Sequence, residues 1–197
     1  MLIKIEAHRY MYYFLKSKVT LFEFEEWIYD HGELEEILGE AEYFQFISRD
    51  YKNQYAYEDT EKQIRKLIDI ATYEQERVVN LLISLTEGNN DEIDVMDILY
   101  DEYCNGYTFL RYIALTHVAT SDEFKENVKR NKLKLKDYNK SIIKEAKRLL
   151  NFFGRNELEI AIEHEYIDRR KEEDRIEIHS INEMFNRLKL IRFVNTL

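Results

Sequence analysis

The chain has 197 residues, no proline, five glycines, one cysteine and a formal net charge of −10. This length fits one domain and is sufficient to bury a hydrophobic core without disulfides or metal ions. The lone Cys104 excludes a disulfide within the chain and is compatible with a reducing cytosol. No apolar run reaches the roughly 18 residues of a spanning helix, and the charges from Lys4 to Arg9 argue against a signal peptide. We therefore expect a cytoplasmic protein without a membrane partner.

The composition favours an all-α fold. Sheet proteins need turns built from glycine, proline and Asn-Gly pairs, which are scarce here. Charged residues make up 35% of the chain and apolar residues 45%, a mixture typical of amphipathic helices. We predict a single helical domain over residues 1–197, a bundle of about eight to ten helices. A minor strand pair near the termini stays open, because Leu2–Ile5 and the alternating Arg175–His179 both fit short strands.

The apolar spacing predicts a first helix over about residues 3–17. Thr20–Glu23 fits a capping box, so we expect a second helix to begin there and to end before His31. A short helix over residues 33–38 follows, with Gly39 as its left-handed C-cap.

Residues 40–51 predict a further helix that buries four apolar side chains. These are Tyr43, Phe44, Phe46 and Ile47. Asp59 opens the next helix, and Thr72–Gln75 fits a second capping box. Another helix is expected to begin at Asp91 and to end near Asn105.

The run Tyr107–Val118 is mostly apolar and predicts a central buried helix, with His117 as a hydrogen-bonded core histidine. A long polar helix, or two, extends from Ser121 to Gly154. Asn156 caps a helix through Ile167, and Ser180–Glu183 fits a third capping box for the last helix.

Acidic residues are concentrated in the first half of the chain. The net charge is −14 over residues 1–110 and +4 over residues 111–197, so the shift near residue 120 marks a candidate subdivision into an acidic and a more basic helical part. Residues 21–40 hold eight acids and no lysine or arginine, interleaved with aromatic residues. A second cluster lies in residues 91–102, where helical spacing places three aspartates on one face.

Such surfaces repel nucleic acid and attract basic partners. The alternative is a solvated face that only keeps the protein soluble. The residues that we assign to partner binding are Glu23, Glu25, Glu26, Trp27, Tyr29, Asp30, Glu33, Glu35, Glu36, Asp94, Asp97 and Asp101.

Residues 125–148 form the reverse pattern, with ten basic and three acidic residues. Four lysines share one helical face and predict contacts to phosphates in an alternative, nucleic-acid-binding function. They are Lys129, Lys132, Lys136 and Lys140. Aromatic residues for base stacking are scarce in this segment, so a solvated or internally paired face is the competing interpretation.

The sequence gives almost no support for catalysis. His164 and Asp168 stand at the spacing of one helical turn and superficially resemble His-Glu-x-x-His, but the second histidine and a third ligand are missing. Cys104 fits a buried, inert thiol. Phosphate-binding loops and nucleophile motifs are absent from the sequence. We therefore expect a protein that is not an enzyme and that has no metal ion or cofactor.

Three stretches carry a family resemblance. They are Phe24-Glu25-Glu26-Trp27-Ile28-Tyr29 with the following Glu33–Gly39, the aromatic run Tyr43–Tyr51, and Tyr103–Leu110. Together they resemble small bacterial immunity proteins of polymorphic or contact-dependent toxin systems, over about residues 8–115. The resemblance implies a protein that binds a cognate toxin domain and blocks it. We interpret the chain as a non-catalytic binding protein for a toxin or another basic protein, such as a nuclease. A nucleic-acid-associated regulator is the alternative, and the oligomeric state stays open.

Overall fold

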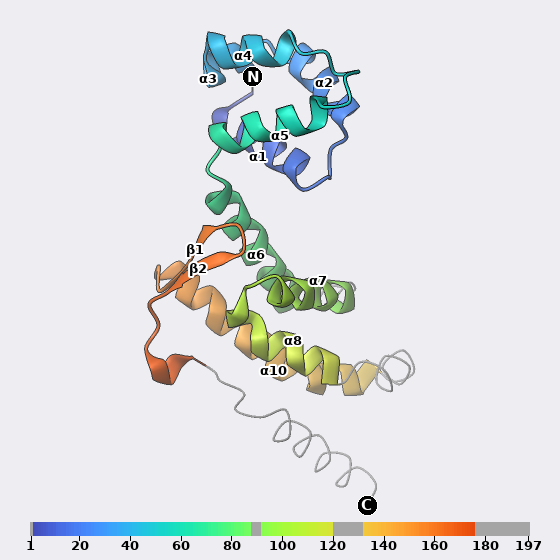
Figure 1. Cartoon of the computed structure of the whole chain (residues 1–197). Coiled ribbons are helices and arrows are strands. Elements are labelled where there is room, and N and C mark those ends of the chain that lie inside the picture. Colours follow the sequence, from blue (N-terminus) through green and yellow to red (C-terminus); the bar gives the residue numbers. More distant parts are fainter. Residues whose placement is uncertain (1, 88–91, 120–131, 176–197) are drawn as a thin grey trace, which may run out of the picture. The chain divides into compact units, whose positions relative to one another are not determined.

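The computed structural model describes residues 2–87, 92–119 and 132–175 (Figure 1). Within these residues the chain forms nine α-helices, two short 3₁₀-helices and one two-stranded antiparallel sheet. The predicted, mostly helical fold is confirmed, and the minor strand pair lies toward the C-terminus.

The chain divides into two compact units, Met1–Tyr73 (unit 1) and Glu74–Leu197 (unit 2). The boundary falls within helix α6 (Ile70–Glu87). The change in charge balance near residue 120 therefore does not coincide with this division. Each unit has its own cluster of buried hydrophobic side chains.

Unit 1 is built from five helices and the first turn of α6. The five helices are α1 (Lys4–Leu15), α2 (Leu21–Asp30), α3 (Leu34–Leu38), α4 (Glu40–Ile47) and α5 (Ala56–Leu67). Phe24 of α2 lies between Phe14 of α1 and Phe46 of α4, with ring centroids 4.8 and 5.6 Å away. All three rings are fully buried, so this aromatic contact fixes α2 within the unit.

The predicted capping box at the start of α2 is confirmed. The hydroxyl of Thr20 accepts a hydrogen bond from the Glu23 amide at 3.2 Å, and the Glu23 carboxylate accepts one from the Thr20 amide at 2.8 Å. Two amides of the first turn thus gain partners that the helix itself cannot supply. Gly39, between α3 and α4, has the expected positive φ of 88°, but its ψ of 148° is extended rather than left-handed helical. This backbone conformation favours glycine.

Several expectations for unit 1 are wrong in detail. Helix α1 begins at Lys4, so Leu2–Ile5 is not a strand. Helix α4 already ends at Ile47, and Phe44 is 62% exposed rather than buried. Helix α5 begins at Ala56, three residues before Asp59, so that Asp59 lies within its first turn.

The second capping box is also wrong. Helix α6 begins at Ile70, which places Thr72 inside the first turn, and its hydroxyl donates to the Asp69 carboxylate at 2.7 Å. The predicted N-cap, Thr72, is thus three residues late, because Asp69 is the residue that directly precedes the helix.

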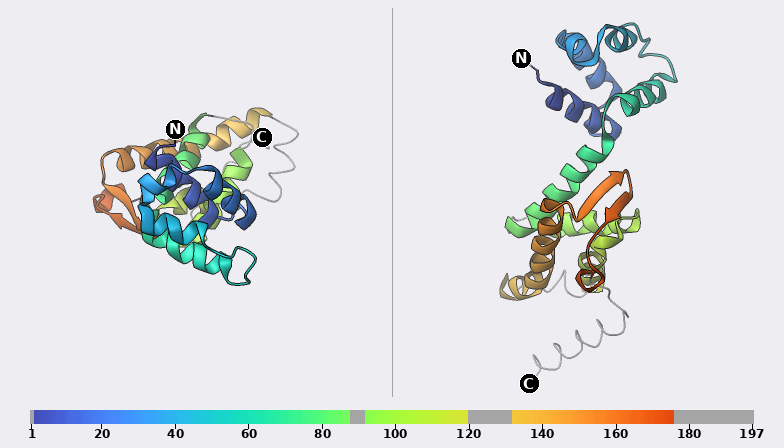
Figure 2. Two further views of the ribbon diagram at one scale, coloured as in Figure 1. Left: turned by 90° about the horizontal axis from the view of Figure 1, so that it is seen from above. Right: turned by 90° about the vertical axis from the view of Figure 1, so that its left-hand side faces the viewer.

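Unit 2 consists of the rest of α6 followed by helices and a hairpin. These elements are α7 (Glu92–Cys104), the 3₁₀-helix η1 (Thr108–Leu110), α8 (Arg111–Ala119), α10 (Lys132–Gly154), β1 (Leu158–Ile162), β2 (Glu165–Asp168) and the 3₁₀-helix η2 (Glu172–Asp174). Figure 2 shows the hairpin and these helices from two further sides. The buried cluster of the unit takes side chains from every one of these elements except β2 and η2.

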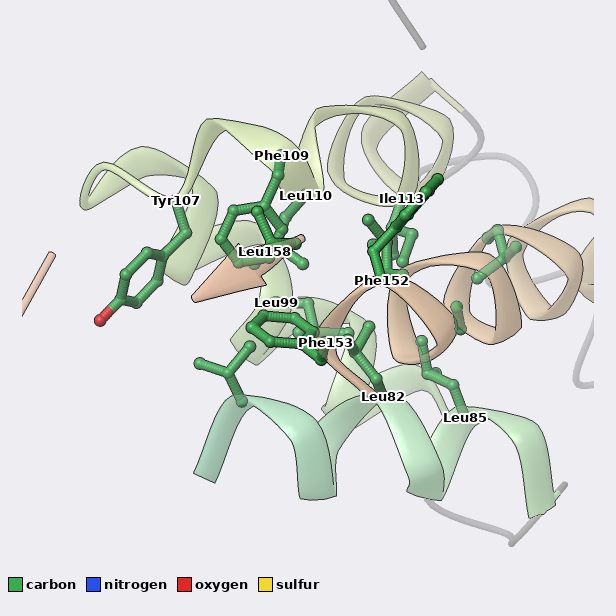
Figure 3. Close-up of a cluster of buried hydrophobic side chains, with 14 of the residues drawn as sticks. Leu82, Leu85, Leu99, Tyr107, Phe109, Leu110, Ile113, Phe152, Phe153 and Leu158 are labelled. Atoms are coloured by element: carbon green, nitrogen blue, oxygen red, sulfur yellow. The ribbon is translucent and has the colours of Figure 1, made fainter. Parts of the chain in front are cut away.

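The apolar run 107–118 contributes Tyr107, Phe109, Leu110 and Ile113 to this cluster, whereas Val118 near its end is 43% exposed. Figure 3 shows side chains of η1 and α8 beside Leu82 and Leu85 of α6 and Phe152 and Phe153 of α10. Tyr107 lies at the edge of the cluster with its hydroxyl turned away from the other labelled side chains. The run is divided into η1 and α8 rather than one continuous helix.

The predicted helix from Asn156 to Ile167 is wrong, because this segment forms the hairpin. Asn156 has a φ of 55°, which ends α10 and turns the chain instead of capping a helix. Leu158 and Ile160 of β1 alternate with Glu159 and are buried, 0% and 6% exposed. The Ile160 amide donates to the side-chain carbonyl of Gln75 on α6 at 2.9 Å. A distant helix thus supplies both the apolar cover and one polar partner of the strand.

Some expectations concern residues outside the described ranges. These are the helix starts at Asp91 and Ser121, the third capping box at Ser180–Glu183, and all of the candidate strand Arg175–His179 except Arg175. Arg175 itself follows η2 and is not in a strand.

Candidate partner-binding surface

The predicted acids of unit 1 lie on α2, on α3 and on the short turn between them. We call the set Glu23, Glu25, Glu26, Asp30, Glu33, Glu35 and Glu36 the acidic segment. All are exposed except Glu25, which is half-buried. Residues 21–48 contain nine acids and no lysine or arginine. Among the residues that the structure describes, no member of the acidic segment forms an ion pair. Their charge is therefore directed to solvent.

Two members of the acidic segment accept hydrogen bonds from backbone amides. Hydrogen bonds from the Thr20 amide and hydroxyl lower the pKa of Glu23 below its ordinary value. Backbone hydrogen bonds, above all from its own amide, also lower the pKa of Glu33. Both carboxylates therefore stay charged to a lower pH than an ordinary glutamate does.

The two aromatic residues predicted for this surface differ in their surroundings. Trp27 is half-buried and stacks on Tyr10 with ring centroids 4.3 Å apart, so most of its contact is internal. Tyr29 is 52% exposed, and its hydroxyl donates to the Ile47 carbonyl of α4 at 3.1 Å. Tyr29 is therefore the more accessible of the two.

Sequence reasoning missed two exposed aromatic residues near the acidic segment. Phe22 on α2 is 64% exposed and Phe44 on α4 is 62% exposed. Phe22 stands seven residues before Tyr29, a spacing that places both on one side of a helix. That spacing was the available signal for Phe22, whereas Phe44 had none, because its neighbours in the aromatic run do pack inward.

The second acidic cluster belongs to unit 2. Asp94, Asp97 and Asp101 are all exposed on α7, at the predicted helical spacing. Asp97 also accepts a hydrogen bond from Nε2 of His117 at 2.6 Å, and His117 is 4% exposed. The expectation of a hydrogen-bonded core histidine is confirmed, and Asp97 is partly committed to the fold.

The basic residues of α10 are described only in part. Lys129 lies outside the described residues, and Lys132 and Lys136 lie in α10 with side chains that are not described. Lys140, Lys144 and Lys147 are exposed, and their spacing places them on one face of α10. The opposite face carries Ile142, Ala146 and Leu149 into the hydrophobic cluster.

Sequence reasoning also missed a partly buried arginine in unit 2. Arg77 of α6 lies between two carboxylates, with Nη2 2.8 Å from Glu74 and 2.7 Å from Glu102. Burial, partly opposed by the hydrogen bond from the His164 amide, raises the pKa of the nearby Tyr107 to about 12. These groups join α6 and α7 to the turn of the hairpin and are explained by the fold alone.

The structure does not place His164, Asp168 and Cys104, the residues weighed for catalysis, as the sequence predicts. His164 sits in the hairpin turn with a φ of 68°, and Asp168 at the end of β2 pairs with Arg170 at 2.8 Å. The expected helical relation between His164 and Asp168 is therefore wrong. Cys104 is exposed at the end of α7 rather than buried. Within residues 2–87, 92–119 and 132–175, no group of three or more acidic, histidine or cysteine side chains is arranged to hold a metal ion.

Comparisons of the chain with protein-family models, curated proteins and solved structures found no match. Among the described residues, no helix combines the length and apolar character that crossing a membrane requires.

Proposed function

We propose that this chain is a non-catalytic, cytoplasmic protein-binding module, an immunity protein that neutralises a cognate bacterial toxin through the acidic segment of unit 1. The supporting observation is that its carboxylates face solvent without a basic residue between positions 21 and 48. A surface of one sign, in a stretch that contains no lysine or arginine from residue 21 to residue 48, fits a partner of the opposite sign.

A toxin that acts on nucleic acid supplies such a partner. A nuclease needs lysine and arginine residues to hold phosphates, and carboxylates that pair with those residues compete with the nucleic acid. Attraction between the two surfaces speeds their encounter, while buried apolar contacts slow dissociation. The aspartates of α7, chiefly Asp94 and Asp101, offer a further set of carboxylates in unit 2.

Binding to a partner at low and high salt tests this proposal. The tagged full chain is used to retain proteins from its native cell extract, beside a variant with Glu25→Lys, Glu26→Lys, Glu35→Lys and Glu36→Lys. We expect one stoichiometric basic protein on the wild-type chain at low salt, its loss at high salt, and its loss from the variant. The retained protein is then purified and its toxicity measured with and without the chain.

The matched control carries Glu58→Lys and Asp59→Lys on α5, where both acids are exposed outside the acidic segment. This control should retain the partner. Equal retention by the wild-type chain and the fourfold variant would contradict the mechanism, and a retained protein without toxicity would contradict the immunity role.

The alternative function is nucleic-acid binding by α10, which is favoured by the exposed face of Lys140, Lys144 and Lys147. Three lysines on one helical face can contact phosphates of one strand. Replacing all three with alanine should then reduce the dependence of DNA or RNA binding on salt. Absence of retention on both nucleic acids at low salt would remove this alternative.

A further inference from the structure

The backbone of strand β2 directs two residues away from its hairpin partner. Ile160 of β1 stands opposite Tyr166 of β2, but the Ile160 amide donates to a side chain of α6 at 2.9 Å. The Arg169 amide, by contrast, donates to the Glu157 carbonyl just before β1 at 2.8 Å. Because hydrogen bonding alternates along an antiparallel strand, the amides and carbonyls of Tyr166 and Asp168 point to the outer edge of β2.

This outer edge has backbone groups that need partners. Within the described ranges, the Tyr166 amide and carbonyl and the Asp168 amide form no hydrogen bond. The Asp168 carbonyl accepts one from Nη2 of Arg175 at 3.2 Å and can accept a second. The opposite edge of the hairpin is engaged by Gln75 of α6. An edge with unpaired amides and carbonyls is a template for a further strand, and β2 provides it.

The exposed side chains of β2 and the residue after it alternate in a particular order of charge. Ile167 is 42% exposed, and Glu165 and Arg169 stand two residues to either side of it, both exposed. Glu165 forms no ion pair with any residue that the structure describes. Arg169 uses Nη1 for Glu159 and for the Asn156 carbonyl, and its Nε and Nη2 have no partner in the same ranges. The order is thus acid, isoleucine, base.

Such an order is complementary to itself in an antiparallel pair. A two-fold axis at Ile167 places this residue opposite its own copy, and Glu165 opposite Arg169 of the second copy. The same register places Tyr166 opposite Asp168 of the second copy, so that the outward groups form four backbone hydrogen bonds. Shifting the register by two residues in either direction places a charged residue opposite Ile167. Hydrogen bonding and charge therefore select the same register.

We propose that the chain forms a homodimer in which β2 pairs antiparallel with β2 of a second copy, centred on Ile167. Two hairpins then join into one four-stranded sheet, with two Glu165–Arg169 pairs across the junction. Backbone hydrogen bonds hold the strands together, and the side chains fix the register. This interface lies in unit 2, apart from the acidic segment, and goes beyond the proposed function.

Cysteine cross-linking tests the register. In a Cys104→Ser background, which removes the chain's own exposed thiol, Ile167→Cys should give a disulfide-linked dimer on mild oxidation. The two Cα atoms of such a directly opposed pair lie about 4.5 Å apart, within the range of a disulfide. Glu165→Cys is the matched control. It should stay unlinked, because its own copy stands four residues along the ladder, about 13 Å away. Linking at 165 alone, or at neither position, overturns the register.

Reversing single charges tests the side-chain pairs on the otherwise natural chain. Glu165→Arg and Arg169→Glu each place like charges opposite each other, and sedimentation equilibrium should show dimerisation weakened about tenfold in each. An equal mixture of the two variants should regain the dimer, because every arginine of one variant then meets a glutamate of the other. This recovery also shows that both variants fold. Lys147→Glu, an exposed charge reversal on α10, is the control and should dimerise like the wild type.

The oligomeric state of the wild-type chain decides the proposal as a whole. A chain that is still monomeric at about 1 mM, where even weak pairing is populated, overturns it. That result also covers the case in which the chain's own residues 176–197, or another protein, occupy the edge of β2. A dimer that neither charge reversal weakens is formed by another surface, which overturns the proposal as well. None of these outcomes affects the test of the acidic segment.

Discussion

Gly106 and His164 approach so closely that no side chain fits between them. A Cβ atom at Gly106 would lie 2.7 Å from the carbonyl oxygen of His164, and Gly106 has a φ of 128°. The His164 amide donates to the hydroxyl of Tyr107 at 3.0 Å. The turn of the hairpin is thus held against the turn that follows α7 by one close backbone approach and one hydrogen bond.

Gly106→Ala should therefore destabilise unit 2 by about 2–3 kcal/mol, because the new Cβ meets backbone and the φ is strained for any other residue. Urea denaturation followed by circular dichroism measures the loss. Gly154→Ala is the matched control, since a Cβ there has nothing within 4 Å, and it should cause no loss. Equal midpoints of urea denaturation for both variants would show that the turn accommodates the new Cβ atom without a loss of stability.

Thr20→Ala should destabilise α2 by about 1 kcal/mol, because it removes the hydroxyl that accepts the Glu23 amide. Thr20→Ser keeps that acceptor and should restore most of the stability. The two melting curves decide the matter, and a serine variant as unstable as the alanine variant would show that the hydroxyl does not act as a cap.

Asp168→Asn should destabilise unit 2 by about 3 kcal/mol, because it leaves the Arg170 guanidinium without its charged partner in a buried site. Arg170 is 6% exposed, and both carboxylate oxygens of Asp168 accept from it, at 2.9 and 2.8 Å. Glu159→Gln is the control. Its partner, Arg169, has a side chain that is 51% exposed, so the loss should stay below about 1 kcal/mol. Urea denaturation of the two variants gives the comparison.

The Asp168 pair should also make stability depend on pH. Burial alone would raise the pKa of Asp168, but hydrogen bonds and charge from Arg170, with the charge of Arg175, hold that pKa below its ordinary value of 3.8. A carboxyl with a lowered folded pKa stabilises the fold above its ordinary pKa and loses that contribution as pH falls through the folded value. The difference between the wild type and Asp168→Asn should be constant near neutral pH and shrink below about pH 3.8. A difference that persists at lower pH would contradict the charged pair.

The acidic segment and the exposed aromatic residues near it, Phe22 and Phe44, should have separate effects on the binding kinetics of the proposed partner. Charge reversal at Glu26 and Glu35 should lower the association rate and its dependence on salt, because attraction acts before contact. Phe22→Ala and Phe44→Ala should leave the association rate near the wild-type value and speed dissociation. Surface plasmon resonance against the retained partner, at two salt concentrations, gives both rates. An unchanged dissociation rate in the phenylalanine variants would exclude them from the interface.

Sequence reasoning succeeded where the interacting residues are close in the sequence and failed where they are far apart. The capping box of Thr20 and Glu23 lies within four residues, so its pattern contains all of the chemistry. The hairpin depends on Gln75, a residue 85 positions before the Ile160 amide that it binds. Asn156 has the side chain of a good N-cap, yet the same residue type tolerates positive φ, and only the distant packing of Leu158 and Ile160 decides between the two.

The same contrast holds for the candidate site. Exposure of the acidic segment was predictable, because carboxylates without basic neighbours are seldom buried. The surroundings of the aromatic residues were not predictable, since Trp27 stacks on Tyr10 of α1, whereas Phe44 is 62% exposed. Helical spacing shows which side chains share a face of a helix, but the packing of neighbouring helices determines which face is buried.

The chain contains a single tryptophan, Trp27, and it lies in unit 1. Helix α6 gives Ile70 and Tyr73 to the cluster of unit 1, and Val78 and Leu82 to the separate cluster of unit 2. Intrinsic tryptophan fluorescence therefore reports the unfolding of unit 1 alone. Far-ultraviolet circular dichroism reports the loss of helix in both units. The gap between the two midpoints measures how far the units unfold as one cooperative system, with no label added to the chain.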